Sequence, residues 1–242
     1  MLGHSHAMSG MAVGALTIPA AAQIGVTGTT QQVAWVCAMA GFAMLPDLDQ
    51  RGATIGRLWG PITAVVATGI GKVAKGHRNG THDAVLAPLA FGGIALLAPL
   101  HPWASMALLA FAIGIAAKAM HLFVPGGSEN TVLGNLALSW GGAYFLTQQG
   151  DATFGWLPFA VAGGVLVHIA GDALTVGGCP VPLTWMDGHA KRYSLKLFKT
   201  GRPIETHFLA WVFLAIGLYG VWLHVTMPDF EGAIRDAVEA IA

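Results

Sequence analysis

Histidine and aspartate gather in four short segments at the ends of long apolar tracts. The segments read GHSHAMSG at 3–10, LPDLDQ at 45–50, GHRNGTHD at 76–83 and HIAGDALTVGG at 168–178. Ionisable side chains beside membrane-crossing tracts are costly, and they usually face the protein interior and serve a function. Imidazole nitrogens and carboxylate oxygens bind zinc at about 2.0 to 2.2 Å. These four segments therefore predict one site for a divalent metal.

Two of the segments have spacings that suit metal ligands. His168 and Asp172 are four residues apart, so on a helix both side chains emerge from one stripe, one turn apart. Pro46 is expected to end the preceding helix, and Asp47 and Asp49 then point the same way if the next segment is extended. A carboxylate of this kind can bridge two cations.

The segment GHRNGTHD must turn if its two histidines are to converge. His77 and His82 are five residues apart, and Gly80 between them supplies backbone freedom. Arg78 is either a cation that extends to the membrane surface or a ligand for phosphate. Asp83 could cap the helix that follows. The segment thus combines candidate metal ligands with a candidate anion-binding side chain.

Each pattern also has a purely structural interpretation. An isolated HxxxD pair on a helix is more often a structural hydrogen bond than a pair of ligands, and an isolated DxD pair is a weaker signal still. Five histidines without a partner pattern are interpreted as caps, interface residues or core residues, namely His4, His101, His121, His189 and His224. The conjunction of four His/Asp segments on one expected face favours metal binding over coincidence.

The composition is that of a membrane protein. Of the 242 residues, 55% are hydrophobic and only 10% are charged, whereas soluble domains carry about 25% charged residues. The 33 glycines suit closely packed transmembrane helices. Twelve basic and twelve acidic residues balance, so the charge indicates no nucleic-acid partner.

The apolar tracts predict an all-α fold, a polytopic transmembrane helical bundle of about seven spans that forms one domain over residues 1–242. A membrane-crossing helix needs about 20 mainly apolar residues. The spans are expected near 10–28, 31–46, 83–100, 103–124, 131–148, 155–176 and 207–226. Residues 60–75 are apolar but short, which favours an interfacial or re-entrant helix.

Lysine and arginine indicate the orientation of these spans. With seven alternating spans, the loops at 47–82 and 177–206 share one face and hold ten of the twelve basic residues. The positive-inside rule makes this face cytoplasmic in a multi-pass protein of the inner (plasma) membrane. The same alternation places all four His/Asp segments there, so the metal site is expected at this membrane face.

The motifs LPDLDQ, GHRNGTHD and HIAGDALTVGGCPVPLTW, in this order and after SHAMSG, resemble those of the YdjM-type family of inner-membrane-associated metal-dependent hydrolases. The resemblance covers most of the chain in scattered blocks. The family pattern falls on His6, Asp47, Asp49, His77, Arg78, Thr81, His82, His168, Asp172 and Thr175, with a weaker match at Gly201 and Glu205. Gln50, Asn79 and Asp83 depart from the family pattern.

The resemblance implies a membrane-embedded metal-dependent hydrolase, which we interpret as a phosphoesterase acting on a lipid-linked phosphate. The expected metal is zinc, with one to three ions bound by His6, Asp47, His77, His82, His168 and Asp172, and with Glu205 as a further ligand. Asp49 is expected to orient a ligand or act as a general base, and Arg78 to hold the phosphate. The expected partners are the lipid bilayer and the lipid-phosphate substrate.

Two other functions remain open at this point. The same His/Asp cluster could bind a translocated cation or relay protons in a transporter. Alternatively, the metal could be structural and the protein a scaffold for a cytoplasmic partner. The polar residues cluster at one face and the opposite half of the bundle offers almost no ionisable path, which counts against transport.

Overall fold

A computed structural model describes residues 1–121, 130–148, 154–188 and 190–227. These residues are mainly helical, as the all-α prediction requires. The helices are α1 (Gly3–Leu16), α2 (Ile18–Ala21), α3 (Gly28–Phe42), α4 (Pro61–Val73), α5 (Leu86–Ala95), α6 (Pro102–Ala119), α7 (Val132–Thr147), α8 (Leu157–Leu174) and α9 (Ala210–Val221). Two short 3-10 helices, η2 (Leu45–Asp49) and η4 (Gly80–His82), lie between them, and the two-residue strands β1 (Cys179–Pro180) and β2 (Arg192–Tyr193) pair antiparallel.

The expected number of seven spans is not confirmed. Among the described residues, three helices are long and apolar enough to cross a membrane: α6, α8 and the continuous helix Ile204–Thr226 that contains α9. A fourth is counted if α1 is joined to Ile18–Ile24 across a bend of 62°. α3 and α7 have 15 and 16 residues, too few at 1.5 Å per residue for a hydrocarbon core of roughly 30 Å. The end of the span expected at 103–124 lies outside the described residues.

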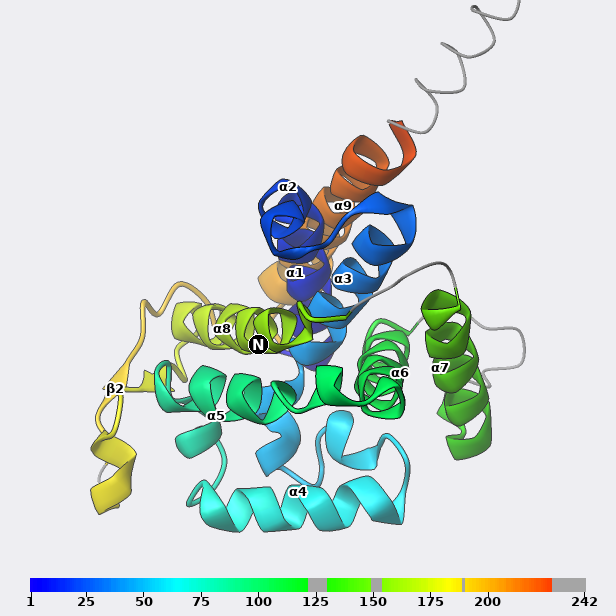
Figure 1. The fold of residues 1–242 in the computed structure, drawn as a ribbon. Helices are drawn as coiled ribbons and strands as arrows, with labels where there is room; N and C mark the ends of the chain where they lie inside the picture. The colour runs from blue at the N-terminus through cyan, green and yellow to red at the C-terminus, as the bar shows by residue number, and fades with distance from the viewer. Residues whose placement is uncertain (122–129, 149–153, 189, 228–242) are drawn as a thin grey trace, which may run out of the picture.

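The helices cross one another instead of forming a parallel bundle. α1 packs against α3, α8 and α9, while α5 packs along α8 and α6 packs against α3 and α7. In Figure 1, α4, α5 and α8 lie across the view, whereas α1, α3 and α9 run obliquely upward from them. The His/Asp segments lie where the ends of α1, α3 and α8 meet.

The end of α3 and the middle of α8 approach closely because residue 164 is glycine. A Cβ atom at Gly164 would lie 2.7 Å from the backbone carbon of Phe42 and 2.8 Å from the backbone nitrogen of Ala43. Any larger residue would therefore push α8 away from this backbone. The contact fixes the distance between α8 and the chain that continues from α3 into η2.

Helix α4 corresponds to the interfacial helix expected at 60–75. It is 13 residues long and apolar, and it packs against η2. Several of its large side chains are exposed, among them Val65 at 72% and Val73 at 80%. The structure confirms a short apolar helix here, and its place at the membrane interface stays a prediction.

Asp83 forms hydrogen bonds both with the start of α5 and with the loop that contains Leu183 and Trp185. One oxygen of this buried carboxylate accepts hydrogen bonds from the backbone N–H groups of Val85 and Leu86, both at 2.9 Å. The other oxygen accepts from the backbone N–H of Leu183 at 2.7 Å and from the indole of Trp185 at 2.9 Å. The prediction that Asp83 caps the following helix is confirmed.

We expect Asp83→Asn to lower the free energy of unfolding by about 1–2 kcal/mol at neutral pH, and we expect this loss to shrink in acid. Burial opposes ionisation of Asp83, but hydrogen bonds from Leu183, Leu86, Val85 and Trp185 outweigh it and lower the pKa below 3.8. Such a carboxyl stabilises the fold above its unfolded pKa, and this contribution is lost as pH falls through the folded value. Thermal unfolding of both proteins from neutral pH to about pH 3 measures the difference. A difference that stays constant over this range would contradict the assignment.

Candidate metal centre

Six of the side chains predicted as metal ligands lie together where α1, α3 and α8 meet. They are His6 on α1, Asp47 in η2, His77 in the loop before η4, His82 in η4, and His168 and Asp172 on α8. Their nitrogen and oxygen atoms form three groups in which all ligand atoms lie within 4.8 Å of one another. The groups are His6, Asp47 and His168; Asp47, His77 and His82; and His82, His168 and Asp172.

His82 and His168 direct ligand atoms at each other, and carboxylate oxygens of Asp172 and Asp47 lie close to both. Nε2 of His82 and Nε2 of His168 are 3.2 Å apart, and two nitrogens bound to one tetrahedral zinc ion would be about 3.3 Å apart. Oδ2 of Asp172 lies 3.6 and 3.8 Å from these two nitrogens. Oδ1 of Asp47 lies 3.7 Å from each of them. These separations suit a metal ion bound by the two histidines and a carboxylate of Asp172 or Asp47.

Hydrogen bonds on the far sides of the two rings fix their tautomers. Nδ1 of His168 lies 2.7 Å from the carbonyl oxygen of Ala43, so this nitrogen carries the hydrogen. Nδ1 of His82 lies 3.1 Å from Oγ1 of Thr81, whose own hydrogen is donated to Asp49. Each ring then presents an unprotonated Nε2 to the other. Two lone pairs at this distance repel unless a cation lies between them, so the arrangement fits a bound metal ion.

Buried polar atoms without a hydrogen-bond partner point to the same place. Within the described residues, Oδ2 of Asp172 and both ring nitrogens of His6 are buried without such a partner. The His6 ring stacks on the His168 ring, with centroids 3.6 Å apart. A buried polar atom left unpaired is costly. A bound cation would remove this cost at Asp172.

The loop residues of the cluster have shifted pKa values. Burial and the neighbouring His168 hold the pKa of His82 well below 6.5, so its ring is neutral, as a ligand must be. Burial raises the pKa of the Asp47 carboxyl. A nearby positive charge would counter that rise. For His77, burial lowers the pKa, but the hydrogen bond and the charge of Asp49 outweigh it and the pKa is raised.

The two aspartates of LPDLDQ do not point the same way, and the expectation of an extended segment was wrong. Leu45–Asp49 is a 3-10 helix, with three residues per turn, so positions two apart face different directions. Asp47 points to His82 and His168, whereas Asp49 points to the loop that carries His77.

The turn in GHRNGTHD also differs from the expectation. The left-handed backbone conformations occur at Gly76 (φ 100°) and Arg78 (φ 60°), not at Gly80. Gly80 is needed for a close approach instead, because a Cβ there would lie 2.9 Å from the ring of Trp185. The two histidine rings of the segment nevertheless converge as expected, with His77 and His82 centroids 5.3 Å apart.

Asp49 organises the loop around the ligands. Its carboxylate lies 2.8 Å from Nδ1 of His77, and it accepts hydrogen bonds from the backbone N–H of Arg78 at 3.1 Å and from Oγ1 of Thr81 at 2.6 Å. The bond to Nδ1 leaves Nε2 of His77 available as a ligand atom. Of the two roles expected for Asp49, these contacts favour orienting a ligand over acting as a general base.

We expect Asp49→Ala to lower metal affinity about 10- to 100-fold, because partners that orient ligating histidines typically contribute that much. Asp49→Asn should recover part of the loss, since its amide oxygen can still accept from Thr81. Competition with a chelator, monitored by metal content, measures both variants. Unchanged affinity in Asp49→Ala would show that His77 and Thr81 are held by other contacts.

One side of the cluster is open. The side chains of His77, Arg78 and Asp47 are 36%, 18% and 16% exposed, whereas those of His82 and His168 are fully buried. Nη2 of Arg78 donates a hydrogen bond to Asp172 at 3.0 Å. A guanidinium carries five N–H donors, so this contact leaves capacity for an anion at the open side.

Glu205, which was predicted as a further ligand, is buried but makes different contacts. One of its carboxylate oxygens accepts a hydrogen bond from the backbone N–H of Leu2, and the other accepts from Gly201 at 2.7 Å. It belongs to none of the three groups of possible ligands among the described residues. Glu205 therefore holds the N-terminal segment in place through Leu2, and the Met1 amino group of that segment contacts Asp172.

The carbonyl of Ala43 contributes to the site although no sequence pattern indicated it. This carbonyl orients His168, yet a backbone carbonyl is common to every residue type and leaves no signal in the sequence. Thr81 was implied only by the resemblance, and the structure gives it a contact to Asp49 and His82. Of the histidines interpreted as structural, His189 lies outside the described residues.

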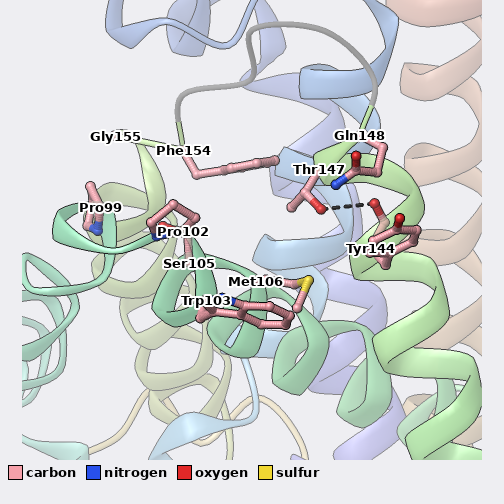
Figure 2. A pocket seen from close by; sticks show the side chains of 10 residues that line it. All are labelled: Pro99, Pro102, Trp103, Ser105, Met106, Tyr144, Thr147, Gln148, Phe154 and Gly155. Atoms are coloured by element: carbon pink, nitrogen blue, oxygen red, sulfur yellow. Dashed lines mark hydrogen bonds between the residues drawn. The ribbon is translucent and has the colours of Figure 1, made fainter.

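A separate cavity of about 540 Å³ lies among α6, α7 and the residues that precede α8 (Figure 2). Aromatic side chains line it, including Trp103, Tyr144 and Phe154, and among the described residues its lining holds no histidine, cysteine, lysine, arginine or carboxylate. Phe154 precedes the N-terminal end of α8, whereas His168 and Asp172 lie near the C-terminal end of that helix. The described lining of this cavity therefore lacks the imidazole and carboxylate ligands found in the cluster.

The fold and the cluster define a helical protein with apolar candidate membrane spans and buried histidines and aspartates that could hold a metal ion. Residues 1–124 match the family model described as YdjM inner membrane protein. The chain belongs to the YdjM inner membrane protein family, as its motifs implied. The matched part includes Asp47, His77 and His82, whereas His168 and Asp172 lie beyond it. No curated protein and no solved structure matches the chain.

Proposed function

We propose that this protein is a membrane-embedded, metal-dependent hydrolase that cleaves a phosphoester bond of a lipid-linked phosphate at the cytoplasmic face of the inner membrane. The proposed ligands are His6, Asp47, His77, His82, His168 and Asp172. The observation that carries the proposal is the pair of facing Nε2 atoms of His82 and His168 beside the unpaired Oδ2 of Asp172. This donor set suits zinc, and the three groups would accommodate one to three ions.

The open side supports a catalytic centre over a purely structural one. Structural zinc sites are closed by four protein ligands, whereas catalytic sites keep a position for water or substrate. Here His82 and His168 form the buried wall, and Asp47 and His77 reach partly exposed surface. A substrate would approach from that surface.

The residues of the chain would divide the chemistry among them. A bound divalent cation would supply Lewis acidity toward a phosphoryl oxygen and lower the pKa of water from 15.7 to about 7. Arg78 would hold the phosphate through guanidinium N–H groups that Asp172 does not use. Asp49 would keep His77 and Thr81 in place. Buried His82 and His168 would exclude bulk water from the inner wall.

The proposed location and domain organisation follow from the same residues. Basic residues of the 47–82 and 177–206 loops would attract anionic lipid to the cytoplasmic face. The cluster draws on Asp47 and His82 from the first half of the chain and on His168 and Asp172 from the second. We therefore propose that residues 1–242 act as a single domain of a multi-pass protein.

The distribution of ionisable groups counts against a transporter. Among the described residues, the fully buried histidines and acidic residues all lie near the ends of α1, α3 and α8 that meet at the cluster. The helices α6 and α7 contribute only neutral buried polar groups, such as Asn135 and Ser139. A cation path through the bundle would lack ionisable partners beyond the cluster.

The test is hydrolysis by purified protein reconstituted in nanodiscs. Zinc-loaded protein is expected to release phosphate from a lipid phosphate, and a chelator is expected to abolish the release. Asp47→Ala should lack this activity. Metal-dependent uptake of zinc into proteoliposomes without hydrolysis would support the transporter instead, and bound metal with neither activity would support a structural role.

A further inference from the structure

An apolar groove runs between α4 and α5 and reaches Gly80 and Thr81, next to the candidate metal centre. Its volume is about 790 Å³, and its walls come from α4, α5 and Trp185. None of its lining side chains is charged, and the hydroxyl of Thr81 is the single aliphatic polar group among them. Figure 1 shows α4 and α5 alongside one another, with the loop that carries η4 at one end.

The inner end of the groove lies next to the metal centre. Gly80 and Thr81 line the groove, and Oγ1 of Thr81 also contacts Asp49 and Nδ1 of His82. One short segment thus separates the apolar groove from the ligands. A molecule in the groove would present its inner end to the cluster.

The groove has an apolar rim and positively charged side chains at one end. Val73, Leu89 and Ile94 along its rim are 80%, 67% and 69% exposed, as expected for residues that contact hydrocarbon. Lys72 and Lys75, both exposed, lie at the C-terminal end of α4, next to the loop that carries Arg78. Cations at one end and an apolar channel along the rest complement an anionic headgroup attached to a long hydrocarbon chain.

Trp185 is held rigidly as part of the groove wall. Its indole donates a hydrogen bond to Asp83, and its ring lies against Gly80. The neighbouring Met186 carbonyl accepts from Lys75. These contacts hold the loop of Trp185 and Met186 beside the segment that lies between the groove and the cluster. Such a fixed wall suits a preformed binding site.

We propose that this groove binds the hydrocarbon chain of the substrate and places its phosphate at the metal centre. This inference rests on the proposed function and adds to it the substrate class, a phosphate ester carrying one long hydrocarbon chain. The groove then sets specificity: hydrolysis efficiency rises with chain length until the groove is filled.

The test compares dodecyl phosphate with the soluble ester p-nitrophenyl phosphate, using zinc-loaded protein in nanodiscs. Gly69 lines the groove, and a Cβ added there meets no atom within 4 Å, so we expect the Gly69→Leu side chain to occupy the groove while the backbone keeps its place. The kcat/KM of Gly69→Leu for dodecyl phosphate is expected to fall about tenfold or more, which corresponds to the burial of about two methylene groups. Its kcat/KM for p-nitrophenyl phosphate should not change. The matched control is Gly93→Leu on α5, which is equally open but does not line the groove. It should change neither value.

A binding measurement separates failure of the groove from failure of the proposed function. Dodecylphosphonate, which is not hydrolysed, is expected to bind wild type at least about tenfold more tightly than Gly69→Leu, as measured by calorimetry. This difference without hydrolysis of either ester would retain the groove and reject the phosphoesterase. Equal binding by Gly69→Leu and wild type, or an equal loss for both esters, would overturn the groove, and so would a homodimer that dissociates in Gly69→Leu.

Discussion

His168→Ala is expected to lower the affinity for zinc by a factor on the order of 10² to 10³ and to abolish metal-dependent hydrolysis. A structural zinc site contributes about 10–16 kcal/mol, so each of its four ligands contributes about 2.5–4 kcal/mol. His168 contributes the nitrogen that faces His82 at 3.2 Å. Metal content after dialysis against a weak chelator, together with thermal unfolding, measures the effect.

The matched control is His101→Ala. His101 is an exposed histidine at the start of α6, where its ring accepts a hydrogen bond from the backbone N–H of Trp103. Its loss should reduce helix stability slightly and leave metal content unchanged. Wild-type metal affinity in a folded His168→Ala protein would remove His168 from the ligand set.

Gly164→Val is expected to impair both stability and metal binding, although residue 164 is not a ligand. Its side chain would collide with the backbone of Phe42 and Ala43, and such overpacking costs about 1–3 kcal/mol or more. Displacement of α8 would also break the hydrogen bond between His168 and the Ala43 carbonyl. Loss of such an orienting bond lowers metal affinity about 10- to 100-fold.

Gly163→Ala provides the control for this variant. A Cβ at Gly163 would meet only the flexible end of the Met39 side chain, at 3.2–3.3 Å. Since that end can move, stability and metal affinity should stay near wild type. Equal effects of the two variants on metal affinity would mean that the α3–α8 distance does not control the site.

The helical spacing of His168 and Asp172 was the most reliable signal in the sequence. A helix period fixes which residues share a stripe, and the two side chains do converge, with His168 Nε2 and Asp172 Oδ2 3.8 Å apart. The convergence of His77 and His82 also followed from sequence. His6 was indicated by its position just before the first apolar tract, and family motifs added Thr81, which spacing alone would not identify.

Other features depend on tertiary structure and could not be derived from the pattern. Asp47 and Asp49 separate because the chain after α3 forms a 3-10 helix instead of an extended segment. The span count differed because breaks and bends, such as the 62° bend after α1, leave no clear mark in hydropathy. The role of Glu205 depends on where the N-terminal segment lies.

In the proposed centre, His82 and His168 bind one divalent cation together with a carboxylate of Asp172 or Asp47. The most direct test is a crystal structure of the zinc-loaded protein with anomalous diffraction data at the zinc absorption edge. We expect an anomalous peak at about 2.0–2.1 Å from Nε2 of both His82 and His168, with a carboxylate oxygen at about 2.0–2.2 Å. A fully ordered site without this peak, or with the two imidazoles turned away from each other, would contradict it.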